Sequence, residues 1–263
     1  MHSVSLEEAA AAIPDGATVY LGGAVLNRRP VAVCRGLVDR GARDLDVVTL
    51  AGSVDVDMLV GAGCVRSVRS CYVGMGHAGF APNFSAAVKA AAISDIEYSE
   101  WTMLQGLRAA AEGLPFLPTR AGGGSDVVAA LDFKEVVDPY TGTPYLAVPP
   151  LKPEIAVIHA WRSSPGGDIQ FGWPPEHLWD VDILAARAAG LVVVTVEELA
   201  TAEEVAARSE LTRLFGFEVD FLVHAPAGSW PTACPPVADV DEHALDEYVR
   251  RGGDLAALEV QGR

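Results

Sequence analysis

The chain has 263 residues, half of them apolar, which is enough to bury a complete core in one large α/β domain or two closely packed lobes. Its 35 acidic residues outnumber the 19 Lys and Arg residues, and the net charge of -16 argues against nucleic acid or an anionic membrane as the main partner. No stretch approaches the roughly 18 uninterrupted apolar residues of a membrane-spanning helix. The N-terminus shows no basic region followed by a long apolar run. We therefore expect a soluble, cytoplasmic protein.

The first half of the chain alternates short apolar, β-favouring runs with helical patterns. The predicted elements are a capped helix after Ser5 that ends at the turn signal of Pro14, strands at 17–21, 45–50 and 65–73, and helices at 30–40, 54–60 and 82–92. Such alternation predicts an open, mainly parallel, doubly wound sheet with helices on both faces.

The second half repeats this alternation after a looser stretch. Residues 131–150 contain the turn sequence Asp138-Pro139-Tyr140-Thr141-Gly142, which predicts a surface excursion with a hairpin. The predicted elements that follow are strands at 155–160, 191–196 and 219–223, and helices at 180–189, 201–214 and 241–251. We interpret residues 1–263 as a single domain.

The segment from Ile96 to Val127 carries the main candidate chemistry. Ser99 is suited to cap a helix with apolar residues at three-four spacing, which places Glu100 in the first turn. The helix dipole favours a carboxylate there by roughly 0.3–1 kcal/mol, so Glu100 is either a structural helix-start acid or a catalytic base. Glu97 is a possible second carboxylate. The turn at Gly122, Gly123 and Gly124 offers backbone N–H groups that can stabilise an oxyanion.

Four further residues are also candidates. Gly22 and Gly23 join a predicted strand to a helix, where backbone N–H groups can approach a ligand, although no nucleotide-binding fingerprint follows. Arg29, beside Arg28, is either a solvated charge, which is the simpler interpretation, or an anion clamp. His77 is a candidate base in the glycine-rich segment 74–79, or a merely exposed loop histidine.

The four cysteines give no metal or disulfide pattern. They are widely spaced, with no C-x-x-C and no nearby paired histidines, so we interpret them as buried thiols. These residues are Cys34, Cys64, Cys71 and Cys234.

Several segments between Ala17 and Pro231 occur in the order of a known family. They include Tyr20-Leu21-Gly22-Gly23, Gly113-Leu114-Pro115-Phe116-Leu117-Pro118, Ile158-His159-Ala160 and Val194-Thr195-Val196-Glu197-Glu198. Each is weak alone, but together they resemble the α subunit of family I CoA-transferases such as glutaconate CoA-transferase.

This resemblance implies an open α/β fold and acyl-CoA chemistry in an active site shared with a β subunit, in a heterodimer or an α2β2 assembly. Coenzyme A would be part of the substrate, with no bound cofactor and no metal. In the transferases a β-subunit glutamate attacks the thioester and forms an acyl anhydride. We do not find its motif here, so the chain alone is expected to be inactive.

The segment Glu97-Tyr98-Ser99-Glu100 also resembles a steroid ring-cleaving hydrolase of the same fold, which has an essential glutamate at the position of Glu100. Glutaconate CoA-transferase has a neutral amide there. The hydrolase resemblance implies that Glu100 activates water for C–C cleavage of a cyclic acyl-CoA, with oxyanion donors from Gly122 to Ser125 or from Gly22 and Gly23.

Arg120, which the hydrolase resemblance includes, either holds a substrate carboxylate or forms a surface salt bridge. A non-catalytic domain that senses acyl-CoA or sugar phosphates is the alternative from another functional class. No DNA-binding helix-turn-helix or basic patch supports that alternative.

Overall fold

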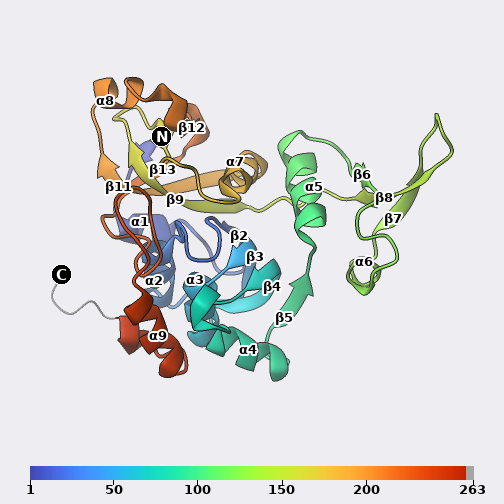
Figure 1. Cartoon of the computed structure of the whole chain (residues 1–263), viewed down its shortest axis with the longest axis horizontal. Coiled ribbons are helices and arrows are strands. Elements are labelled where there is room, and N and C mark those ends of the chain that lie inside the picture. Colours follow the sequence, from blue (N-terminus) through green and yellow to red (C-terminus); the bar gives the residue numbers. More distant parts are fainter. Residues whose placement is uncertain (259–263) are drawn as a thin grey trace.

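The structure is a computed structural model that describes residues 1–258. A large, mainly parallel sheet runs through the body, and a small antiparallel sheet forms a projecting lobe (Figure 1). The main strand order is β1-β13-β11-β9-β2-β3-β4-β5, with β10 and β12 attached beside β9. This arrangement confirms the predicted α/β fold. The strand order reverses between β2 and β9, which is the topological switch point of the sheet.

The strands of the large sheet are β1 His2–Ser3, β2 Thr18–Leu21, β3 Leu45–Gly52, β4 Val65–Val73, β5 Ser94–Glu97, β9 Ile155–Ser163, β10 Ile169–Gln170, β11 Leu191–Leu199, β12 Thr212–Leu214 and β13 Phe221–His224. The helices of the body are α1 Leu6–Ala11, α2 Val31–Asp39, α3 Val54–Gly61, α4 Pro82–Lys89, α5 Glu100–Ala111, α7 Trp179–Ala188, α8 Ala202–Ala206 and α9 Glu242–Arg250. Short 3-10 turns are η1 Gly76–Ala78, η2 Ser209–Leu211, η3 Gly216–Glu218 and η4 Leu255–Leu258. The lobe consists of β6 Leu117–Thr119, α6 Asp126–Ala130, β7 Lys134–Val137 and β8 Pro144–Val148.

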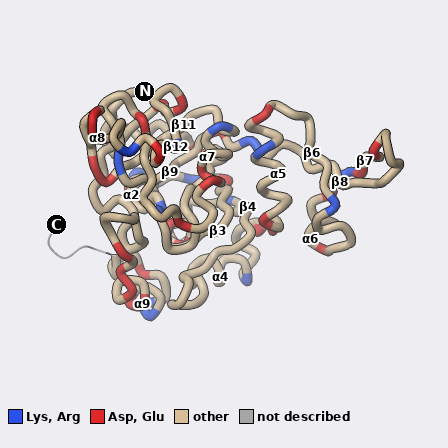
Figure 2. The backbone as a smooth tube through the Cα atoms, turned by 45° about the horizontal axis from the view of Figure 1, so that its top comes forward, with Lys and Arg blue, Asp and Glu red and all other residues tan. Residues whose placement is uncertain are grey.

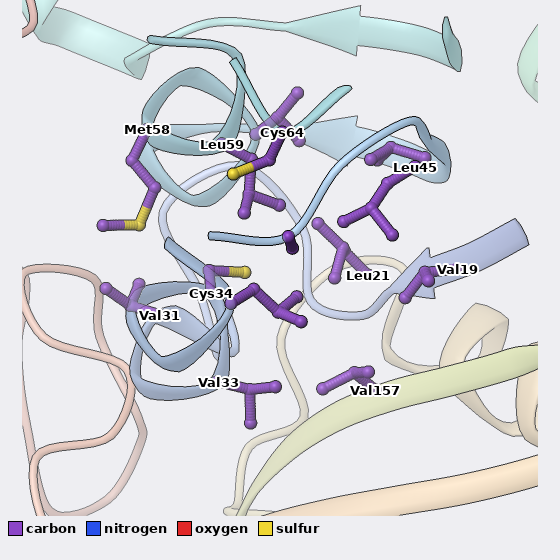
Figure 3. Close-up of a cluster of buried hydrophobic side chains, with 14 of the residues drawn as sticks. Val19, Leu21, Val31, Val33, Cys34, Leu45, Met58, Leu59, Cys64 and Val157 are labelled. Carbon is purple, nitrogen blue, oxygen red and sulfur yellow. The ribbon is translucent and has the colours of Figure 1, made fainter. Parts of the chain in front are cut away.

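Helices cover both faces of the large sheet, and each face has its own core. On one face, α1, α2, α3 and α9 pack over aliphatic residues from the central strands. Cys34 and Cys64 lie among these aliphatic side chains (Figure 3). On the other face, α5 and α7 pack against Tyr20, Val48 and Leu50. Cys34, Cys64 and Cys234 are buried as predicted, whereas Cys71 is only partly buried.

The helix α5 begins where its sequence predicts. The hydroxyl of Ser99 accepts a hydrogen bond from the Thr102 N–H, and the Thr102 hydroxyl accepts one from the Ser99 N–H. This reciprocal cap satisfies two donors that a helix start otherwise leaves unpaired. The N-cap of α5 is thereby fixed, and Glu100 is its first helical residue.

Two predictions about element boundaries are wrong. The helix predicted at 201–214 ends at Ala206, because the chain then turns into β12, which pairs antiparallel with β10. The Gln170 side-chain amide donates to the carbonyl oxygens of Val205, in the last turn of the shortened helix, and Arg208, just after it. The surface excursion is also longer than 131–150. The hairpin of β7 and β8 is present, but β6 and α6 precede it in the same lobe.

The charged residues are dispersed along the chain. Figure 2 shows Asp and Glu positions along α8 and α9 and near other helix ends, with Lys and Arg positions scattered among them. Within residues 1–258, no helix combines the length and the apolar character needed to cross a membrane.

The loop between β2 and α2 is held by two arginines with no exposed surface, Arg28 and Arg29. Arg29 forms an ion pair with Asp55 at 2.5 Å and donates to the carbonyl oxygens of Gly23 and Ala51. Arg28 pairs with Glu176 and with Asp182. The interpretation of these arginines as solvated charges is therefore wrong, because both guanidinium groups are structural and buried.

Replacement of Asp55 with Ala is expected to lower the free energy of unfolding by about 3–5 kcal/mol, because it leaves the Arg29 guanidinium buried and unpaired. Urea unfolding followed by circular dichroism measures this loss. The control is Arg250→Ala, which breaks an exposed ion pair with Glu247 and should leave the unfolding midpoint nearly unchanged. Equal losses in the two variants would contradict the importance of the buried pair.

Candidate functional site

The switch-point crevice, where open α/β sheets commonly bind ligands, is filled by side chains of the chain itself. Asp182 of α7 accepts hydrogen bonds from the Gly23 N–H at 3.0 Å and from the Tyr20 hydroxyl at 3.1 Å. The Gly22 N–H donates to the Val157 carbonyl oxygen as part of the strand pairing. The N–H groups of Gly22 and Gly23 are therefore occupied, which corrects their assignment as oxyanion donors.

Glu100 lies at the carboxyl end of the edge strand β5, on the first turn of α5. Its side chain is exposed and makes no hydrogen bond or ion pair with any residue of the described range 1–258. Cys71 of β4 lies close enough to sense this charge. Burial, together with Glu100 and Glu97, raises the pKa of the Cys71 thiol to about 12. The sequence did not indicate this proximity.

The projecting lobe contacts the residues on both sides of Glu100. The Trp101 indole N–H donates to the Thr119 hydroxyl at 2.9 Å, and the Tyr98 ring lies 6.3 Å from the Phe133 ring, centroid to centroid. These contacts bring the end of β6, with the following turn, to the start of α5.

The return segment of the lobe crosses α5 at Gly106. The Gly106 carbonyl oxygen accepts the Leu151 N–H, and a Cβ at Gly106 would meet the Leu151 Cβ at 2.9 Å. Only a glycine permits this close approach, which fixes the second connection between lobe and helix.

The glycine turn lies on this lobe, as does Arg120. Gly122 and Gly124 adopt positive φ angles of 79° and 80°. Their exposed N–H groups have no acceptor within residues 1–258, whereas the Gly123 N–H makes a long contact of 3.4 Å with the Arg120 carbonyl oxygen. Ser125 caps α6 and donates its hydroxyl to the Gly122 carbonyl oxygen. Gly122 and Gly124 are therefore the available N–H donors of the predicted set.

The remaining predicted residues are distributed differently. Glu97 ends β5 and is exposed. Arg120 is also exposed and forms no ion pair within residues 1–258. Arg29 is buried in the loop after β2. His77 is exposed in η1, with its Nε2 atom 3.7 Å from an Asp246 carboxylate oxygen of α9.

The topology of the sheet separates two of the predicted regions. Gly22 and Gly23 follow β2, whereas Glu100 follows β5, three strand positions away. At about 4.8 Å per step, this separation is about 14 Å. The structure thus associates Glu100 with Glu97, Cys71 and the lobe, and leaves Gly22, Gly23 and Arg29 at the centre of the sheet.

Comparison with known proteins identifies the class. The sequence profile of the Coenzyme A transferase family matches residues 3–223. The α (A) subunit of glutaconate CoA-transferase from Acidaminococcus fermentans is 32% identical over 254 residues, which cover 90% of this chain and 78% of that protein. The IpdA subunit of the cholesterol ring-cleaving hydrolase from Rhodococcus jostii is 32% identical over 258 residues, covering 94% and 84% of the two chains.

A solved structure agrees with these relatives. A chain of the decarboxylase AibA/AibB, in a cysteine-to-serine variant, superposes with a TM-score of 0.88 at 31% identity, covering 98% of this chain and 97% of that one. An uncharacterised protein from Archaeoglobus fulgidus is 31% identical over 94% of this chain, which spans 55% of that protein's length. The chain belongs to the coenzyme A transferase family, and its resemblance to the α (A) subunits is confirmed.

Replacement of Glu100 with Gln is expected to lower the pKa of Cys71, because loss of a nearby negative charge favours the thiolate. At a mildly alkaline pH, alkylation of Cys71 by iodoacetamide should become roughly three-fold faster, which corresponds to about 0.5 pKa unit. Peptide mass spectrometry measures the rate at this residue. Glu135→Gln, an exposed carboxylate of β7, is the control. An unchanged rate in Glu100→Gln would show that Glu100 does not act on Cys71.

Proposed function

We propose that the chain is the α subunit of a heteromeric CoA-transferase that acts on acyl-CoA thioesters in an active site shared with a β subunit. Membership of the coenzyme A transferase family supports the reaction class. The observation that carries the location is the unpartnered, exposed carboxylate of Glu100 beside the free N–H groups of the lobe. Polar groups left open in this way form one wall of a site, which a second subunit completes.

The roles follow from the chemistry of each group. A glutamate of the β subunit supplies the nucleophile and forms an acyl anhydride, with release of the CoA thiolate. The N–H groups of Gly122 and Gly124 stabilise the negative charge that develops on the carbonyl oxygen. Arg120, a cation without an acidic partner in residues 1–258, holds a carboxylate of the acyl group or of the acceptor acid.

A hydrolase that cleaves a C–C bond of a cyclic acyl-CoA, as in steroid degradation, is the second candidate. The observation that favours it is again Glu100, because a carboxylate without a partner can accept a proton from water. In this reaction, Glu100 takes a proton as the water oxygen attacks a ring carbonyl, and the electron pair of the broken C–C bond forms an enolate. The presence or absence of a nucleophilic glutamate in the β subunit decides between the two reactions, since transfer requires that residue.

The test is co-expression with the β subunit, incubation with a panel of acyl-CoA thioesters, and borohydride or hydroxylamine trapping before intact mass measurement of both chains. A modified β-subunit glutamate is expected for the transferase. Entry of solvent oxygen into a ring-opened CoA product, without an adduct, would instead identify the hydrolase. Absence of both outcomes, with an assembled complex, would overturn the proposal.

Glu100→Gln separates the two mechanisms further. In the hydrolase, this variant should assemble normally and lose about 10²–10⁴-fold in turnover, because the general base is gone. A transferase should tolerate the change far better. Glu97→Gln, three residues earlier and also exposed, is the matched control. Full hydrolytic activity in Glu100→Gln would exclude Glu100 as the base.

A further inference from the structure

A second cluster of chemically active side chains lies on the opposite half of the sheet. His159 of β9 and Thr195 of β11 are directly paired in adjacent parallel strands, and Glu197 lies two residues further along β11 on the same face. A loop brings Cys234 to the same place. This loop is anchored by backbone hydrogen bonds between Ala233 and the β2–α2 loop. The ligating atoms of His159, Glu197 and Cys234 all lie within 4.8 Å of one another.

The side chains of His159 and Glu197 each have an orienting contact. The His159 Nδ1 atom is 2.7 Å from the Thr195 hydroxyl oxygen, so its Nε2 atom points to a Glu197 carboxylate oxygen at 2.9 Å. The second carboxylate oxygen of Glu197 accepts the Ala227 N–H at 2.5 Å. Metal-binding histidines are characteristically held through their other ring nitrogen in this way.

Burial and charge suit a divalent cation. His159 and Cys234 have no exposed surface, and Glu197 is only 8% exposed. A thiolate, a carboxylate and a neutral imidazole together balance two positive charges, so the metal-bound site carries no net charge inside the protein.

The neighbouring cation Arg28 does not oppose the binding of a divalent cation. It donates to the His159 carbonyl oxygen, but its charge is paired with Glu176 and Asp182. Gly228 leaves room for the imidazole ring, because a Cβ there would approach the His159 Cε1 atom to 3.0 Å.

We propose that His159, Glu197 and Cys234 form a three-ligand Zn²⁺ site. The sulfur, nitrogen and oxygen donors favour zinc over magnesium or calcium, which prefer oxygen ligands alone. Glu197 also lines a cleft of about 670 Å³, together with Ala227 and Trp230. This cleft gives the metal an entry path and supplies a fourth ligand, water or a small anion, as in zinc sites with an open position.

The site is independent of the acyl-CoA chemistry proposed for Glu100. β11 and β5 are five strand positions apart in the sheet, which is about 24 Å at 4.8 Å per step. Failure of one proposal therefore leaves the other intact.

The test uses the full chain, treated with a chelator and then titrated with Zn²⁺ or Co²⁺. One Zn²⁺ per chain by mass spectrometry and a thiolate-to-cobalt charge-transfer absorption are expected. Cys234→Ser should lose the absorption and bind zinc at least about 100-fold more weakly, and Thr195→Val should bind it roughly 10–100-fold more weakly, because the imidazole loses its support. Cys34→Ser, which replaces a buried thiol of α2 that is not part of the cluster, should retain both properties.

If Cys234→Ser does not fold, the wild-type chain still gives an answer, because bound Zn²⁺ should protect Cys234 from alkylation during partial unfolding. A wild-type chain that binds no zinc, or a cobalt absorption that persists in a folded Cys234→Ser variant, would overturn the proposal. The contact between His159 and Glu197 would then be a hydrogen bond that only supports the fold.

Discussion

The buried ion pairs of Arg28 and Arg29 are the constraint on which the centre of this molecule depends. The loop that carries them crosses the switch point of the sheet, and its two arginines reach opposite layers. Arg28 pairs with Asp182 of α7, while Arg29 pairs with Asp55 of α3. An unpaired buried charge costs several kcal/mol, so the loop cannot leave its position without a large loss of stability. The two helical layers are joined through this loop as well as through the sheet.

This constraint explains where chemistry can occur. The carboxyl edge at the switch point is the usual ligand crevice of an open α/β sheet, but here Asp182 already accepts the Gly23 N–H and the Tyr20 hydroxyl. Groups that remain available lie on either side of the switch point. At the edge strand β5, Glu100 and the lobe present free polar groups to solvent. On the other side of the switch point, the pairing of β9 with β11 brings His159 beside Thr195 and Glu197.

Local patterns in the sequence predicted much of the fold and the position of Glu100. The alternation of apolar strands and helices was sufficient for the doubly wound sheet, and Ser99 marked the start of α5. The strand β5 was not predicted because Ser94-Asp95-Ile96-Glu97 is a polar edge strand with one partly buried residue. The helical pattern beyond Ala206 was misleading because Leu211 is buried in the 3-10 turn η2 and Leu214 in the strand β12, which pairs with β10.

Contacts between residues that lie far apart in the sequence could not be predicted from such local patterns. Two adjacent arginines in a glycine-rich loop resemble solvated charges until the fold supplies Asp55 and Asp182. Rules for zinc sites rely on closely spaced ligand pairs, so they give no signal for His159, Glu197 and Cys234, which come from three separate segments. For Glu100 the difficulty was different, because the same first-turn position serves both a helix-start acid and a catalytic base.

The charge of the chain finally constrains the partner. On the proposed function, the substrate carries the several negative charges of coenzyme A, whereas this chain has a net charge of -16, so long-range attraction cannot bring that substrate to its surface. Local cations must hold the phosphates, and Arg120 near the glycine turn is exposed without an acidic partner in residues 1–258. A single guanidinium cannot offset the phosphates of coenzyme A and a substrate carboxylate together. On the proposed function, the face of the β subunit that completes the site beside Glu100 therefore has to be basic.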